Sequence, residues 1–491
     1  MPRTRHLHLD NVITSMPELG PTVPDGGYSW LIFVGVIAIK MTVPSVLAIY
    51  GVVLSYVHID AEPDIHLWQG SVTLTPILLL AFWNLTDPWS RTIVNMDSVP
   101  RAVGLIGVFL LIVGVLASGY LTTEGIGSLI LRLSAGGVMG IGASLVIMQS
   151  ENLLRRHFRT RLALVLTMKH IANSLGMTIV PAYAYMLLKN AGLRTGTLLF
   201  ATVLVPGILG ACTFDAPVLK RTMPYSLLIS EEDNELNIRD ISDVTTTSPN
   251  PEVIHRRASH EDAEITREGP PTLFSEENNS YAYDEPADDI NLFVTPIGRV
   301  ASSWTEEFRM LLSIKFWSVV PAWFGTKASM ISFFVLSPSL ILTEDKQGVN
   351  ALGQCVTLTT VIGLGMLLPG IMSYWSPRTA RCRSIYFGCM CWLGAAALLG
   401  LAFSTDYAWS LLWSFFGGVS IMGCAVGQES VLRDLLGPTG ANRAHTALSM
   451  IVGFILLLLI FVKSFPLCLQ IVAITQLMGG SYWILNPIVG A

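Results

Sequence analysis

Three lysines lie within long apolar stretches of the chain: Lys40, Lys169 and Lys327. A charged side chain at bilayer depth costs about 2.5–3.5 kcal/mol on insertion scales, so an intramembrane cation is a functional hypothesis by default. Lys40 lies near the middle of the first apolar stretch, and Lys327 lies a third of the way into the seventh. We expect these two ammonium groups to attract a carboxylate, with Lys169 as a further substrate-binding candidate. The competing interpretation is that each lysine snorkels or faces a water-filled cavity.

Other ionisable side chains also fall inside apolar stretches. His170 follows Lys169, and it is a candidate proton relay or a packing histidine. Arg132 lies near the start of the fourth stretch and Glu429 near the end of the tenth, where they are either gate or coupling groups or merely interfacial. No His-Glu-x-x-His, P-loop or nucleophile-elbow motif occurs, so we expect neither an enzyme nor a cofactor. Cys389 and Cys391 are two residues apart and face different ways on a helix, which argues against a metal site.

Composition indicates which elements hold these side chains. Hydrophobic residues make up 52% of the 491 residues and charged residues 13%, against about 25% charged residues in soluble domains. The chain is therefore solvated mostly by the lipid bilayer and is long enough for about a dozen spans and one polar insert. No basic patch is interleaved with aromatics, so no nucleic-acid partner is expected. The seven cysteines lie in or beside apolar stretches, which predicts no disulfide framework.

The apolar stretches number six, then a long polar segment, then six more. We predict an all-α membrane protein with twelve transmembrane helices in two six-helix bundles and a long cytoplasmic central loop. Its parts are a tail at 1–24, an N-terminal bundle at 25–215, a disordered linker at 216–312 and a C-terminal bundle at 313–491. The predicted spans are 24–57, 67–85, 102–120, 125–148, 162–188, 196–214, 316–342, 352–374, 385–403, 408–432, 447–462 and 467–489.

Lysines and arginines in the short loops predict how the chain is oriented in the membrane, because cytoplasmic loops carry more of these residues than external loops do. One set of alternate loops holds Arg91, Arg101, Arg155, Arg156, Arg159, Arg161, Arg378, Arg381, Arg383, Arg433 and Arg443. The other set holds only Lys189, Arg194, Lys346 and Lys463. The first set is therefore predicted to be cytoplasmic, together with both termini and the linker. This alternation also favours an even number of spans.

The first span opens with Asp25-Gly26-Gly27-Tyr28-Ser29-Trp30, which resembles the first signature of the monocarboxylate transporter family in the major facilitator superfamily. Phe158, Arg161, Leu164 and Gly176 fit a second signature of that family. The resemblance implies the major facilitator fold and a plasma-membrane carrier that moves small organic acids by alternating access, with symport of H+ as one mode. It also implies a single-span accessory glycoprotein as partner. Asp25, with its two glycines, and Arg161 are expected to serve folding and gating.

The chain departs from this family where proton coupling is concerned. Proton-coupled members have a lysine late in span one and an aspartate and an arginine in span eight. The corresponding positions here are Ala48 in span one and Leu364 and Leu368 in span eight, or Val361 and Gly365 if the alignment contains a gap. None of these residues ionises, and no Asp, Glu, Lys or Arg occurs from 348 to 377. Proton coupling and facilitated diffusion therefore both stay open. Two functions compete: a carrier of monocarboxylates or related metabolites, and a relative that does not transport and acts as a binding or regulatory membrane protein.

Overall fold

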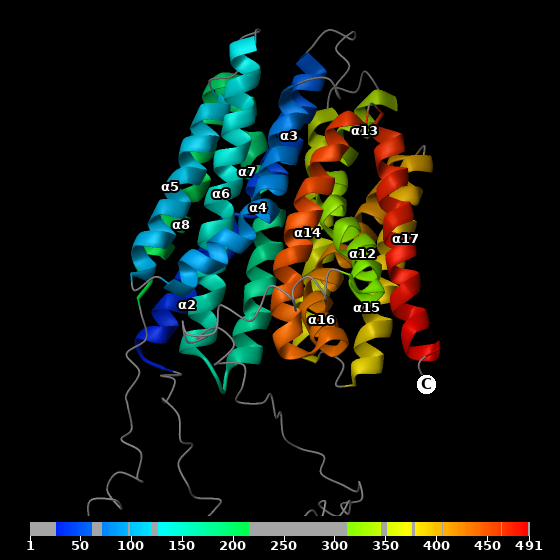
Figure 1. Ribbon diagram of the computed structural model, residues 1–491. Coiled ribbons are helices and arrows are strands. Elements are labelled where there is room, and N and C mark those ends of the chain that lie inside the picture. The colour runs from blue at the N-terminus through cyan, green and yellow to red at the C-terminus, as the bar shows by residue number, and fades with distance from the viewer. Residues whose placement is uncertain are drawn as a thin grey trace, which may run out of the picture. The chain divides into compact units, whose positions relative to one another are not determined.

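The computed structural model describes residues 26–60, 71–96, 99–119, 126–215, 312–344, 351–375, 379–404, 406–462 and 464–489. All regular structure within these residues is helical. The predicted tail, Asp25 and nearly all of the predicted linker lie outside them. Figure 1 shows the helices of residues 28–212 gathered side by side, with those of residues 314–489 as a second group next to them.

The first group begins with a broken span. α2 (Tyr28–Thr42) and α3 (Val46–Asp60) are separated by a turn at Pro44, whose ring nitrogen has no proton to donate to a helix. The rest of this N-terminal half consists of α4 (Ser71–Met96), α5 (Pro100–Gly119), α6 (Ile126–His157), α7 (Leu162–Leu199), the 3₁₀ turn η1 (Phe200–Leu204) and α8 (Val205–Cys212).

The second group repeats this plan. The C-terminal half consists of α12 (Ile314–Ile331), the π-helical turn η4 (Ser332–Leu336), α13 (Ser337–Glu344), α14 (Ala351–Met372), η5 (Ser373–Trp375), α15 (Ala380–Phe403), α16 (Tyr407–Leu458), η6 (Leu459–Phe461) and α17 (Phe465–Val489). Its first span is also composite, because the π turn η4 joins α12 to α13.

Two glycines complete the count of spans. Gly192 in α7 and Gly437 in α16 both have a φ of 74°, a left-handed conformation that suits glycine, and each divides its helix in two. Ten helical segments are long and apolar enough to cross a membrane. One of the ten, the segment 162–212, is divided at Gly192 and therefore holds two spans. The helix α4 is not among the ten and adds one more span. The described residues therefore form twelve spans, six in each half, which confirms the predicted fold class.

Two predicted boundaries were wrong. The sequence predicts residues 87–91 in the loop after the second span, but α4 continues through them to Met96. It also predicts that the fourth span ends at 148, but α6 continues to His157. Both extensions are polar, so hydropathy stopped short of them. The helices continue because these polar faces meet the other half of the protein instead of lipid. The extensions add Glu151 to the helical part of the chain.

Small residues let the helices approach closely within each half. The glycine-rich run of α6 is one example, because a methyl group on Gly140 would lie 2.6 Å from the Leu79 carbonyl oxygen of α4. Gly35 of α2 and Gly210 of α8 face each other in the same way, since a methyl on Gly35 would lie 2.6 Å from the Gly210 oxygen. These contacts fix the positions of the helices that hold the ionisable side chains.

The two halves touch at one end through backbone atoms. A methyl group on Gly51 of α3 would overlap the carbonyl group of Phe334 in the π turn η4. Elsewhere α7 packs along α14 and α4 packs along α16. At the opposite end, the facing helices carry the arginines Arg91, Arg155, Arg433 and Arg443, and a cavity lies between them. We call this the arginine-rich end.

Candidate functional site

A buried charge cluster joins three helices of the N-terminal half. Lys40 lies in the last turn of α2, Glu151 lies in the polar extension of α6, and Lys169 lies two turns into α7. The Lys40 ammonium donates a hydrogen bond of 2.6 Å to Glu151 Oε1, and the Lys169 ammonium lies 3.4 Å from the same oxygen. The lysine side chains are 8% and 9% exposed and the glutamate 23%. Two cations therefore share one carboxylate, which leaves an excess of one positive charge.

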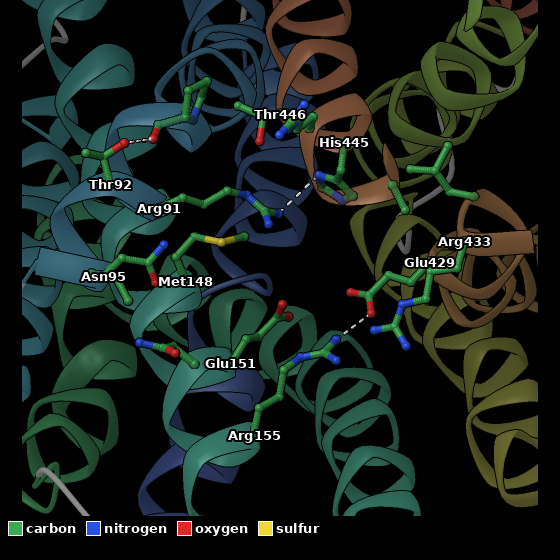
Figure 2. Close-up of a pocket in the computed structure, with 16 residues that line it drawn as sticks. Arg91, Thr92, Asn95, Met148, Glu151, Arg155, Glu429, Arg433, His445 and Thr446 are labelled. Atoms are coloured by element: carbon green, nitrogen blue, oxygen red, sulfur yellow. Dashed lines mark hydrogen bonds and ion pairs between the residues drawn. The ribbon is translucent and has the colours of Figure 1, made fainter. Parts of the chain in front are cut away.

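Glu151 also lines a cavity of about 280 Å³ at the arginine-rich end. Figure 2 shows this cavity between α4 and α6 on one side and the two segments of α16 on the other. Its polar lining consists of Arg91, Thr92, Asn95, Glu151, Asn152, Arg155, Glu429, Arg433, Arg443, His445 and Thr446. A ligand here would contact both halves, and Glu151 is the member of the charge cluster that it would contact, since neither Lys40 nor Lys169 lines the cavity.

Ion pairs cross the cavity from one half to the other. Arg155 of α6 donates a hydrogen bond to Glu429 of α16, marked by a dashed line in Figure 2. The two atoms lie 2.6 Å apart. Arg91 of α4 lies 3.1 Å from His445 of α16 and also pairs with Asp87 at 2.9 Å. His445 in turn lies 3.7 Å from the Asp87 carboxylate. Separation of the halves at this end requires these contacts to break.

Lys327, the predicted partner of Lys40, lies apart from the cluster on α12 in the C-terminal half. Its side chain is half-buried, and it makes no salt bridge with a carboxylate of the described residues. The charges of Asp87, Glu151 and Glu429 nevertheless act on it, so it belongs to the same electrostatic environment. His170 is half-buried beside Lys169, and its side chain makes no hydrogen bond within the described part of the chain.

The two segments that carry the family resemblance meet in the structure. The Arg161 guanidinium lies over the Trp30 ring at 5.6 Å, and Trp30 packs edge-on against Phe33 and Phe158 at 5.6 and 5.4 Å between ring centroids. Ser29 lies 3.1 Å from His157. Arg161 thus holds the start of α2 against the junction of α6 and α7. The side chain of Arg132 and all of Asp25 lie outside the described residues.

Sequence reasoning missed Glu151, the residue at the centre of the cluster. It follows the predicted end of the fourth span, and 111 positions separate it from Lys40. One signal was available: Glu151 and Arg155 are four residues apart, so they share a helix face. Sequence reasoning also missed the buried amide of Asn152, which is 4% exposed and whose two polar atoms have no hydrogen-bond partner. No three His, Cys, Asp or Glu side chains of the described residues gather in a way that could hold a metal ion.

Two six-helix halves that enclose a polar, charged cavity define a polytopic membrane protein with the architecture of alternating-access transporters. The sequence model of the Major Facilitator Superfamily matches residues 88–454. Because this match covers most of the chain, the protein belongs to that superfamily. A search of curated protein sequences found no match.

Solved structures support the same fold. A POT family transporter in complex with 5-aminolevulinic acid is 12% identical, with a TM-score of 0.52 over 95% of this chain and 97% of that one. A POT family transporter in complex with a thioalcohol-conjugated peptide is 14% identical, with a TM-score of 0.51 over 94% of both chains. A point mutant of the peptide transporter POT in complex with alafosfalin is 11% identical, with a TM-score of 0.55 over 95% and 97%. Identities this low establish a shared fold and no shared substrate.

Proposed function

We propose that this protein is a carrier that moves monocarboxylates or related small organic acids across the plasma membrane by alternating access. The observation that carries the proposal is the excess of positive charge in the cluster of Lys40, Lys169 and Glu151. Buried charges are ordinarily paired one to one, because an unpaired ion in a low-dielectric interior is costly. A substrate carboxylate at the edge of the cavity would balance the second lysine.

Lys327 supports the same proposal from the other half. It is a half-buried cation without a salt bridge to the described residues, and it shares the electrostatic environment of the cluster. One anion attracted from both sides would draw the halves together, which is how a substrate can favour one conformation over another. Glu429 and Arg155 then serve as a gate between the halves, with Arg161 holding the base of α2 in place.

The conformation also fits a carrier. The cavity lies at the arginine-rich end, whereas Gly51 and Phe334 close the other end by backbone contact. If the arginine-rich end is cytoplasmic, as the loop charges favour, this is an inward-facing state. Coupling to H+ would have to use groups other than the absent span-eight pair.

Uptake by cells tests the proposal. Cells that display the protein should take up labelled lactate, pyruvate or ketone bodies faster than cells that do not, with and without a co-expressed single-span glycoprotein. The measurement is made at two external pH values, since faster uptake in acid would indicate symport with H+.

The double variant Lys40→Ala, Lys327→Ala should lose most of this uptake, whereas Lys315→Ala, which changes an exposed lysine of α12, should keep it. Unaltered uptake in the double variant would remove the lysines from the mechanism. If the protein reaches the cell surface but transports none of a broad panel of metabolites, it is instead a binding or regulatory membrane protein that does not transport.

A further inference from the structure

Glu151 has a different place in the cluster from the two lysines. It is more than twice as exposed as either of them, and it is the member that lines the cavity. Both ammonium groups contact its Oε1, while its other oxygen, Oε2, accepts no hydrogen bond from the described residues. A ligand that enters from the arginine-rich end therefore meets the Glu151 carboxylate before it meets Lys40 or Lys169, neither of which lines the cavity.

The Glu151 carboxylate has a large effect on the net charge that a bound anion would meet. Arg155 is paired with Glu429, and Arg91 is paired with Asp87, so each of these pairs is close to neutral. Arg433 and Arg443 of α16 also line the cavity, and the cluster itself holds two lysines and Glu151, with Lys327 more distant. Removing one negative charge here would stabilise any bound anion, and it would stabilise a dianion about twice as much as a monoanion, because the Coulomb energy scales with the charge of the ligand.

From this arrangement we infer that Glu151 determines the charge of the accepted substrate: its carboxylate cancels one of the two buried lysines, so the site favours an acid with one carboxylate over an acid with two. This inference rests on the proposed carrier function and adds a selection rule to it. Glu151 is a specificity-determining residue that acts through Lys40 and Lys169. Selectivity of this kind is the difference between the affinities for the two acids. The group that repels the second carboxylate of a diacid is Glu151, which is already in the site before a substrate binds.

A buried amide beside Glu151 is a second sign of a ligand. Asn152 lines the same cavity, is 4% exposed and has neither amide atom hydrogen-bonded. A buried amide without partners costs free energy unless a ligand or water satisfies it. A monocarboxylate with a neighbouring hydroxyl or keto group would offer one charge to the lysines and one polar group to this amide.

The test compares uptake of lactate, a monoanion, with uptake of succinate, a dianion, at neutral pH. In the isosteric variant Glu151→Gln, the ratio of succinate to lactate uptake should rise by about tenfold or more. Asp406→Asn removes a carboxylate from an exposed position at the start of α16, far from the cavity lining, and should leave the ratio unchanged. An unchanged ratio in Glu151→Gln would overturn the inference while leaving the carrier function intact.

A charge-balanced variant covers the case in which Glu151→Gln does not fold. Glu151→Gln combined with Lys40→Met removes one negative and one positive charge, so Lys169 keeps the original excess. Total uptake by this double variant should fall, because Lys40 belongs to the proposed binding site, while its ratio of succinate to lactate uptake should stay at the wild-type value. A shift of this ratio toward succinate would overturn the inference.

The same comparison can be made by binding instead of transport, by measuring how much lactate or succinate raises the Tm of the purified wild-type and Glu151→Gln proteins. Wild-type protein that neither moves nor binds either acid would contradict the proposed function itself.

Discussion

Arg155 of α6 and Glu429 of α16 form an ion pair of 2.6 Å that joins the two halves of the protein across the cavity at the arginine-rich end. The sequence singles out Glu429 as a gate or coupling group, and its partner in the other half makes a gate the more specific hypothesis. The arginine side chain is 18% exposed and the glutamate 42%, so water screens the pair in part. Its contribution to holding the halves together is therefore modest, about 0.5–1 kcal/mol.

Breaking this pair should shift the protein toward conformations in which the arginine-rich end is wider. The reporter is Asn95→Cys, a thiol in the cavity lining. When Arg155→Ala is added, this thiol should react with a water-soluble maleimide about two to five times faster, which corresponds to the loss of about 0.5–1 kcal/mol. The experiment needs a background without the exposed native cysteines Cys212, Cys382 and Cys389.

The matched control breaks an ion pair within one half. Arg383 of α15 and Asp434 of α16 lie 2.7 Å apart, and both belong to the C-terminal half, so Arg383→Ala should leave the labelling rate unchanged. The swap Arg155→Glu, Glu429→Arg should restore it toward the wild-type value. Equal labelling rates of the Asn95→Cys reporter with and without Arg155→Ala would show that the Arg155–Glu429 pair does not hold the arginine-rich end closed.

Gly51 provides a prediction at the opposite end. A methyl group there would overlap the Phe334 carbonyl, so Gly51→Ala should prevent the close approach of α3 and η4. Uptake should fall by about tenfold or more while surface display persists, because the halves cannot adopt this conformation during the transport cycle. Gly353→Ala in α14 is the control, since a methyl group there meets no atom within 4 Å. Full activity of Gly51→Ala would argue that this end never needs to close so tightly.

The aromatic cluster at the base of α2 is predicted to stabilise the fold. Phe158 is 1% exposed and packs against Trp30 and Phe33. Phe158→Ala should destabilise the protein by about 3–5 kcal/mol, the usual cost of truncating a buried phenylalanine. Thermal unfolding of the purified protein in detergent measures this effect as a lower Tm. Phe403→Ala, at a position that is 72% exposed, should leave the Tm within error. Equal Tm values for the two variants would mean that the cluster is dispensable.

Orientation is tested with tags in intact cells. Epitopes at the N-terminus, at the C-terminus and within residues 220–300 should be unreachable by external antibody until the membrane is permeabilised, because the arginine-rich loops are predicted to face the cytoplasm. A tag between residues 120 and 125, in a predicted external loop, should be reachable without permeabilisation. An external signal from either terminus or from the central segment would reverse the predicted orientation.

The amino-acid sequence by itself determined the fold class and marked two members of the charge cluster. Apolar stretches about twenty residues long determine how many times a chain crosses a bilayer, and a lysine such as Lys40 or Lys169 within one stands out because its burial is costly. The packing role of the glycines in α6 could also be predicted, since small residues are what close helix contacts require.

Only the tertiary structure decided how these residues are paired. Glu151 meets Lys40 across 111 positions of sequence, and Arg155 meets Glu429 across 274, so no local pattern connects them. Hydropathy also ended α4 and α6 too early, because it measures the preference of a residue for lipid and these polar turns face the other half of the protein. A side chain's neighbours follow from how helices pack, and it is this packing that turned two predicted cations into a cluster with a shared carboxylate.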